Sequence, residues 1–119
     1  MLTIRKQQND ALSQYMLRQF ENNMILYLRS QFPTECGDKA EAELRDMVRS
    51  AIKNAEPYGI ESEDGIQCYL GCMAKCGEDF DTNPRTPWAG AILRDAGLGE
   101  VEKAQLLGRN AGIPLPEGA

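Results

Sequence analysis

Hydrophobic residues recur at helical spacing along most of this chain. Near the amino terminus they recur every four residues and form one apolar stripe, at Leu12, Met16, Phe20, Met24 and Leu28. Thr3 can cap the beginning of this helix, and Pro33 ends it because the residue before a proline avoids the helical conformation. Residues 4–31 contain neither Pro nor Gly, so we predict one long helix of about 42 Å that either bends or projects from the domain.

The second helix, predicted over residues 40–55, has the clearest amphipathic pattern. Its apolar residues fall on one face, at Leu44, Met47, Val48, Ala51, Ile52 and Ala55. Acidic residues come first on the other face and basic residues later, which complements the helix dipole. Pro57 and Gly59 end the helix, and Tyr58 between them is predicted to pack back on the core.

Three further helices follow from capping signals. Ser62 is predicted to cap a helix that runs to Cys76 and is ended by Gly77. The Thr86 hydroxyl is predicted to cap a fourth helix, with Pro87 in its first position and Gly97 at its end. A fifth, weaker helix is predicted over residues 100–107.

These elements predict an all-α protein, a single small domain of four to five helices with a long first helix and an extended C-terminal tail. We place the helical domain at residues 1–108 and an extended or disordered tail at residues 109–119. The tail prediction rests on three Gly and two Pro among the last twelve residues. No segment shows the alternating pattern of a strand.

Length and composition agree with this picture. The chain has 119 residues, of which 42% are hydrophobic and 26% charged, as in ordinary folded domains. The longest apolar run, Met24 to Leu28, is far shorter than the roughly 18 residues that a membrane span requires. No signal peptide is visible after Arg5 and Lys6, so we expect a cytoplasmic protein.

The net charge and the lack of histidine argue against several classes of function. The net charge is −5 and no Lys/Arg cluster exists, which argues against nucleic acid and anionic membranes as partners. There is no histidine, so neither a Ser-His-Asp nor a Cys-His arrangement can form within the chain. The glycine spacings match no phosphate-binding loop or dinucleotide fingerprint. We therefore expect no enzymatic activity, no catalytic residues and no cofactor.

The four cysteines leave three interpretations open. Cys68, Cys72 and Cys76 are spaced i, i+4, i+8 and form a row along a helix, and Cys36 lies elsewhere. Three thiols in such a row span about 12 Å, so at most two could readily bind one ion. We expect buried structural thiols and no metal site; a disulfide involving Cys36 and a metal site are the alternatives.

Two features of the loop after residue 77 also admit a functional or a structural interpretation. Asp79, Asp81 and Asn83 match the opening of a calcium loop, but Pro84 stands where that loop requires Gly, so a self-bonded turn is favoured. Phe80 is predicted to anchor the loop in the core. Trp88 is either a core residue or an interface contact.

Three stretches of the chain resemble a family of small helical accessory proteins of bacteria, encoded in type VI secretion effector gene clusters. The first two are TIRKQQNDALSQYMLRQFENNMILYLRSQFP (residues 3–33) and YGIESEDGIQCYL (residues 58–70). The third is DFDTNPRTPWAGAIL (residues 79–93), whose D-F-D-x-x-P-x-x-P-W-A run is the most specific. The chain departs from the family at Cys68, Cys72 and Cys76, where aromatic or aliphatic residues are expected.

The resemblance implies a protein-binding role, as a co-chaperone or adaptor that helps to hold or load a secretion effector. The partner would be the effector or its adaptor chaperone. An immunity protein that neutralises a cognate effector is the first alternative, and a self-associating structural protein, such as a homodimer, is the second. The resemblance assigns no functional residue.

The first helix carries more apolar residues than one buried stripe requires. They spread over more than half of its circumference, so we expect an exposed apolar patch that contacts the partner. The candidate protein-binding residues are Tyr15, Leu17, Phe20 and Tyr27, together with Trp88. The alternative is a helix that bends and is fully wrapped by the domain.

Overall fold

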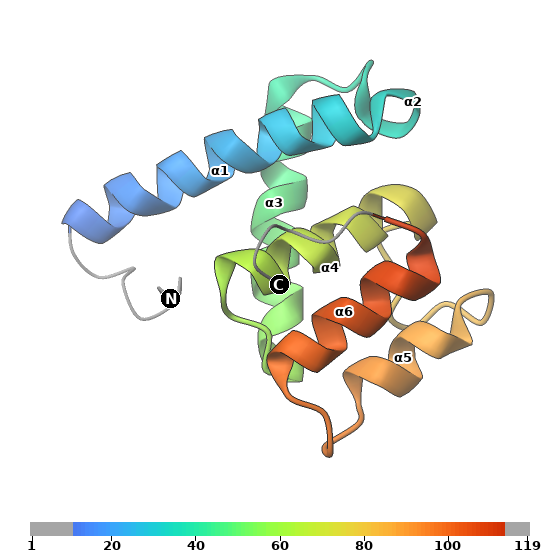
Figure 1. Cartoon of the computed structure of the whole chain (residues 1–119). Coiled ribbons are helices and arrows are strands. Elements are labelled where there is room, and N and C mark those ends of the chain that lie inside the picture. The colour runs from blue at the N-terminus through green and yellow to red at the C-terminus, as the bar shows by residue number, and fades with distance from the viewer. Residues whose placement is uncertain (1–10, 114–119) are drawn as a thin grey trace.

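The structure is a computed structural model that describes residues 11–113, with side chains from Gln14 onward. These residues form six α-helices and a short 3-10 helix, and no β-strand; Figure 1 shows how the helices are arranged. In chain order they are α1 (Ala11–Gln31), α2 (Pro33–Cys36), α3 (Glu41–Ala55), η2 (Glu56–Tyr58), α4 (Glu63–Cys76), α5 (Pro87–Leu93) and α6 (Glu100–Ala111). The predicted all-α fold is confirmed; Thr3, the predicted start of the first helix at residue 4 and residues 114–119 of the tail lie outside the described residues.

Helix α4 lies at the centre of the fold and contacts α1, α3 and α6 (Figure 1). Most of its residues are buried, including Ile66, Tyr69, Leu70, Cys72 and Met73. A helix that is apolar on most of its circumference requires neighbours on several sides, which α3 and α6 supply. Ser62 caps α4 as predicted, because its hydroxyl accepts a hydrogen bond from the Gly65 amide over 3.1 Å.

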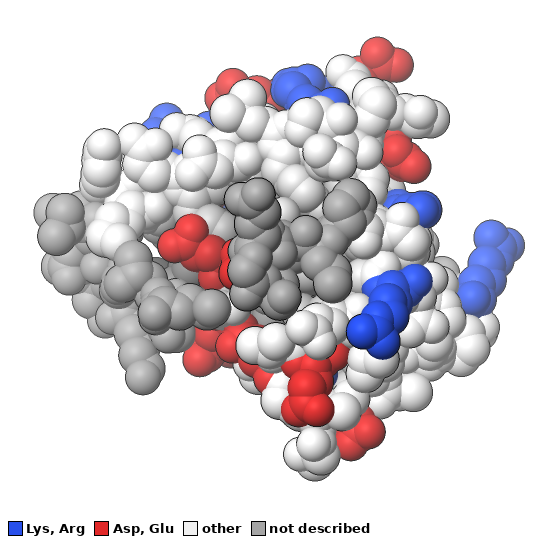
Figure 2. Space-filling model, in the orientation of Figure 1, with Lys and Arg blue, Asp and Glu red and all other residues white. Residues whose placement is uncertain are grey.

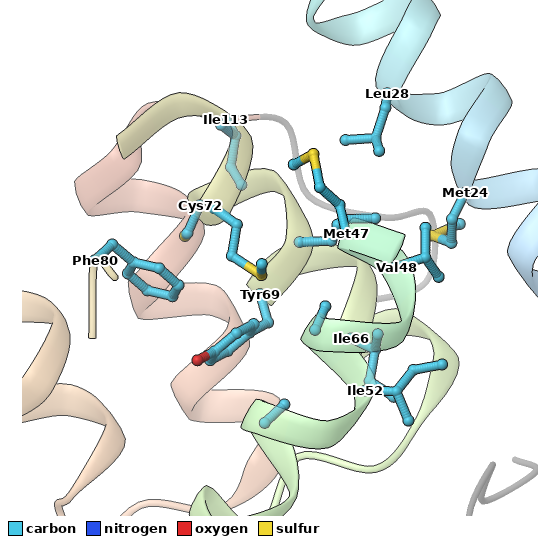
Figure 3. Packing of buried hydrophobic residues seen from close by; sticks show 14 of the residues in the cluster. Met24, Leu28, Met47, Val48, Ile52, Ile66, Tyr69, Cys72, Phe80 and Ile113 are labelled. Carbon is cyan, nitrogen blue, oxygen red and sulfur yellow. The ribbon is translucent and has the colours of Figure 1, made fainter. Parts of the chain in front are cut away.

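Helix α1 joins the core through one side only. Figure 3 shows Met24 and Leu28 of α1 directed toward Met47 and Val48 of α3. All four belong to one buried cluster that continues through α4 to Ile113. Helix α3 begins one residue later than predicted, at Glu41, and buries the six apolar residues that its pattern indicated.

The loop between α4 and α5 is held by its own polar groups. Phe80 is fully buried, and its ring lies 4.9 Å from the ring of Tyr69 (Figure 3). The Tyr58 hydroxyl donates a hydrogen bond of 2.7 Å to Asp81, and Asn83 donates to the carboxylate of Asp79. The bonds from Asn83 to Asp79 confirm the predicted self-bonded turn.

Two details of α5 differ from the predictions. Thr86 is the N-cap residue and Pro87 the first helical residue, but the Thr86 hydroxyl does not cap. It donates to the carbonyl of Phe80 over 2.7 Å instead. The helix ends at Leu93 rather than near Gly97, whose amide bonds the side chain of Asp95.

The last helix is longer than predicted, and one short helix was missed. Helix α6 continues to Ala111 and is ended by Gly112, whose φ of 71° is left-handed. Ala111 and Ile113 are both buried, so the chain packs on the helical domain as far as residue 113. Helix α2 begins at Pro33, in the N1 position, directly after α1 ends.

Between residues 11 and 113, no helix is both long and apolar enough to cross a membrane.

Candidate functional site

The first half of α1 is the part of the described chain that stands out from the globule. Figure 1 shows it reaching beyond the other helices, and no side chain from Gln14 to Gln19 is buried. Figure 2 shows that the visible side of this helix is largely uncharged. The sequence predicted that the first helix either bends or projects from the domain, and the structure shows that it projects.

The outer face of α1 is more polar than predicted. Tyr15 and Leu26 are its exposed large hydrophobic residues, with 61% and 66% of their surfaces accessible. They stand eleven residues apart, which is three helical turns, or about 16 Å. Gln19 lies between them and donates a hydrogen bond of 3.0 Å to the Tyr15 hydroxyl. The expected broad apolar patch is reduced to two separate side chains.

One of the five candidate contact residues, Phe20, belongs to the core, which corrects the prediction for that residue. Phe20 is 4% exposed and lies in the main buried cluster. Tyr27 is half-buried, and its ring packs edge-on against Phe32 at 5.6 Å. Phe20 therefore does not belong to an exposed patch in this conformation, whereas Tyr27 stays partly accessible.

The position of Tyr27 depends on a glycine in α4. A Cβ atom added at Gly71 would lie 2.8 Å from the Tyr27 hydroxyl oxygen and 2.7 Å from Cδ1 of Ile113. The hydroxyl is buried and has no hydrogen-bond partner in the described part of the chain. Burial, with smaller contributions from Cys68 and Cys72, raises the pKa of Tyr27, so the phenol stays neutral.

Tyr15 is exposed and Leu17 is half-buried, and the two line one hollow together. Its volume is about 410 Å³, and its other lining residues are Gln14, Arg18, Glu21 and Arg49. Glu21 is 3% exposed and accepts hydrogen bonds from Arg45 and Arg49 of α3, so its charge is neutralised within the protein. The hollow thus combines an aromatic ring and an aliphatic side chain with two guanidinium groups and one carboxylate.

Trp88 lies apart from this hollow. It belongs to α5, which lies across the globule from α1 in Figure 1. Its side chain is half-buried and packs against the core cluster. The structure therefore brings Tyr15 and Leu17 together but does not bring Trp88 to them.

A second and larger hollow was not predicted from the sequence. It has a volume of about 570 Å³ and lies between α2, α3 and the end of α4. Its lining residues are Glu35, Cys36, Lys39, Glu43, Asp46, Met47, Met73, Ala74, Gly77 and Glu78. The residues come from two stretches that are far apart in the sequence, 35–47 and 73–78, so no short motif marked them.

The cysteines are thiols packed in the fold. Cys36, Cys68 and Cys72 are buried, Cys76 is half-buried, and none of the four is in a disulfide. Burial raises the pKa of Cys68 to about 11, with a smaller contribution from Asp64. Within the described residues, no three cysteine, aspartate or glutamate side chains are grouped so that they could hold a metal ion.

In comparisons with known proteins, no family model matches the chain, and no similar curated protein or solved structure was found.

Proposed function

We propose that this chain is a protein-binding accessory factor, a co-chaperone or adaptor that holds or loads a type VI secretion effector. The three stretches quoted above support the secretion context through their resemblance to accessory proteins of effector gene clusters. The contact would be made by the projecting half of α1, at Tyr15 and Leu17. The proposal assigns binding and no catalytic step to the chain.

One observation supports this contact site above all others. Tyr15 is 61% exposed on the projecting half of α1, and it lines the 410 Å³ hollow with Leu17 and Arg18. A tyrosine combines apolar area with a hydroxyl group, and arginine adds a planar donor, which are the residue types enriched at protein interfaces. A partner side chain that enters this hollow would bury Tyr15 without any change in the core.

The experiment compares two matched variants in a pull-down from the native host with mass spectrometry. Tyr15→Glu and Val101→Glu each replace an exposed hydrophobic residue with a carboxylate, and Val101 is 54% exposed on α6. We expect the wild type and Val101→Glu to recover an effector or adaptor chaperone, and Tyr15→Glu to lose it. Melting temperatures should agree for all three proteins.

Two results would contradict the proposal. Equal recovery of the partner by Tyr15→Glu would exclude the projecting half of α1 as the contact site. Recovery of a nucleic acid or metabolite in place of a protein would exclude the protein-binding role itself. A stable dimer in light scattering, abolished by Tyr15→Glu, would favour the self-associating alternative.

Gene deletion separates a loading role from immunity. We expect deletion to lower the abundance or secretion of the effector while sibling cells remain viable beside the parent strain. If deletion instead makes the cells sensitive to killing by their siblings, the immunity alternative is correct.

A further inference from the structure

The larger hollow combines an apolar floor with an acidic rim. Its floor is formed by Cys36, Met47, Met73 and Ala74, of which the first three are at most 7% exposed. Methionine side chains adapt to ligands of different shapes because they are unbranched and flexible. Burial raises the pKa of the Cys36 thiol, so this part of the floor is uncharged. The floor therefore favours aliphatic side chains.

The rim carries four carboxylates and one lysine. Glu35 comes from α2, Glu43 and Asp46 from α3, and Glu78 follows the end of α4. None of these carboxylates forms an ion pair or accepts a hydrogen bond within residues 11–113, and Lys39 is the only basic residue in the lining. Elsewhere, the Glu21 carboxylate is bonded by two arginines.

We infer that this hollow binds a basic, amphipathic segment of a partner protein, with aliphatic side chains on the methionine floor and lysine or arginine side chains at the acidic rim. Charge complementarity selects this occupant: the lining has a net charge of −3, from four carboxylates and one lysine. The inference rests on the proposed protein-binding role, but it concerns a different surface from the α1 contact.

The geometry disfavours a metal ion as the occupant. No three potential ligands in the described part of the chain come together at one point, as coordination of a metal ion would require. Instead, the carboxylates are distributed around an opening of about 570 Å³, a volume that suits several side chains. Cationic groups spaced along a peptide match this distribution.

A defined peptide tests the inference without the unidentified partner. The probe is acetyl-LKKLLKKL-amide, titrated into the full chain by calorimetry. One control peptide has serine in place of every leucine and retains the charge, and a second has glutamine in place of every lysine and retains the apolar residues. We expect the probe to bind at least about tenfold more tightly than either control, because both floor and rim contribute.

Matched variants then locate the binding site. The triple variant E43Q/D46N/E78Q removes three exposed rim charges, and E61Q/E63Q/D64N removes the same charge at the opposite end of α4. The rim variant should weaken probe binding at least about tenfold, and the control variant less than about threefold. Ala74→Trp fills the floor without any change in charge and should also weaken binding about tenfold.

Three outcomes would overturn the inference. Equal losses in the two triple variants would show that only net charge attracts the probe. Equal binding of the serine peptide, or of spermidine, would show that the floor does not contribute. Absence of probe binding would show that the hollow is not a binding site for such a segment. The pull-down with Tyr15→Glu would still test the α1 contact independently.

Discussion

Arg45 of α3 donates a hydrogen bond of 2.9 Å from Nη1 to the Glu21 carboxylate, which is almost fully buried in the face of α1 that packs on α3. Arg49 donates to the second oxygen of the same carboxylate from Nε over 3.0 Å. Both carboxylate oxygens are thus satisfied where two helices meet, which offsets the cost of removing the charge from water. The Arg45 hydrogen bond to Glu21 also raises the pKa of the guanidinium.

Substitution of Glu21 should therefore be strongly destabilising. Glu21→Ala leaves Arg45 without its buried partner and opens a space between α1 and α3, so we expect a loss of about 3 kcal/mol. Glu41→Ala is the matched control, because Glu41 also pairs with Arg45 but is 70% exposed at its side chain, and it should cost less than about 0.5 kcal/mol. Urea denaturation measures both. Equal values for the two variants would contradict this account.

The end of the chain supplies a second test. Ile113 is buried in the main cluster, beyond the boundary that the sequence predicted. Ile113→Ala should cost about 2–3 kcal/mol, as do other losses of a buried isoleucine. Val101→Ala, at an exposed residue of α6, should change the stability by less than about 0.5 kcal/mol. If the two variants unfold at the same denaturant concentration, residues after 108 do not contribute to the core.

Helix positions and buried faces could be read from the sequence, because a single local pattern determines them. Helix α3 follows from its apolar spacing, and the cap at Ser62 follows from a serine before two acidic residues. The errors arose where one residue type has two roles. The last helix was predicted to end at residue 107, yet Gly108 lies buried inside it, and Pro33 ends α1 but also begins α2.

The candidate sites were harder to predict, because exposure depends on which helices pack together. Phe20 and Tyr15 are both aromatic residues of α1, but only Phe20 is buried in the core cluster. The larger hollow is assembled from segments more than 30 residues apart, such as Asp46 and Glu78. The spacing of apolar residues within one helix does not show which residues of distant segments come together in the folded protein.

The unpaired hydroxyl of Tyr27 leads to a stabilising substitution. A buried polar group without a hydrogen-bond partner costs free energy, so Tyr27→Phe should leave stability unchanged or raise it by up to about 1 kcal/mol. Tyr58→Phe is the control, because its hydroxyl donates to Asp81 over 2.7 Å and its loss should cost about 1 kcal/mol. Thermal denaturation of both variants gives the comparison, and a clear destabilisation by Tyr27→Phe would indicate a partner for this hydroxyl.

The cysteine row can be tested by substitution and by metal content. Cys72 is fully buried, and its thiol lies 3.8 Å from the Leu107 carbonyl oxygen. Cys72→Ala should cost about 1–2 kcal/mol through lost packing, and Cys76→Ala less, because Cys76 is only half-buried. We expect elemental analysis of the purified protein to find no stoichiometric zinc or iron. One metal per chain, lost together with the fold on chelation, would refute the structural interpretation.

Stability should fall in alkaline solution, and Cys68 gives this effect a defined range. Its pKa rises from 9.0 in the unfolded chain to about 11 in the fold, mainly because burial disfavours the thiolate. The unfolded chain therefore releases this proton first as the pH increases, and the folded state loses relative stability between about pH 9 and pH 11. Below pH 9 the contribution is fully present. A shift of this size corresponds to about 2–3 kcal/mol at pH 11.

Denaturation at pH 8 and pH 10.5, with a non-thiol reductant present, measures the loss. Cys68→Ala should reduce the fall in unfolding free energy over this range, because the variant has no thiol to ionise there. The remaining fall comes from other buried groups with raised pKa values, among them Cys72 and Tyr69. Cys76→Ala should reduce the fall less than Cys68→Ala does, since Cys76 is only half-buried. An identical pH dependence in Cys68→Ala and the wild type would show that Cys68 is not buried as described.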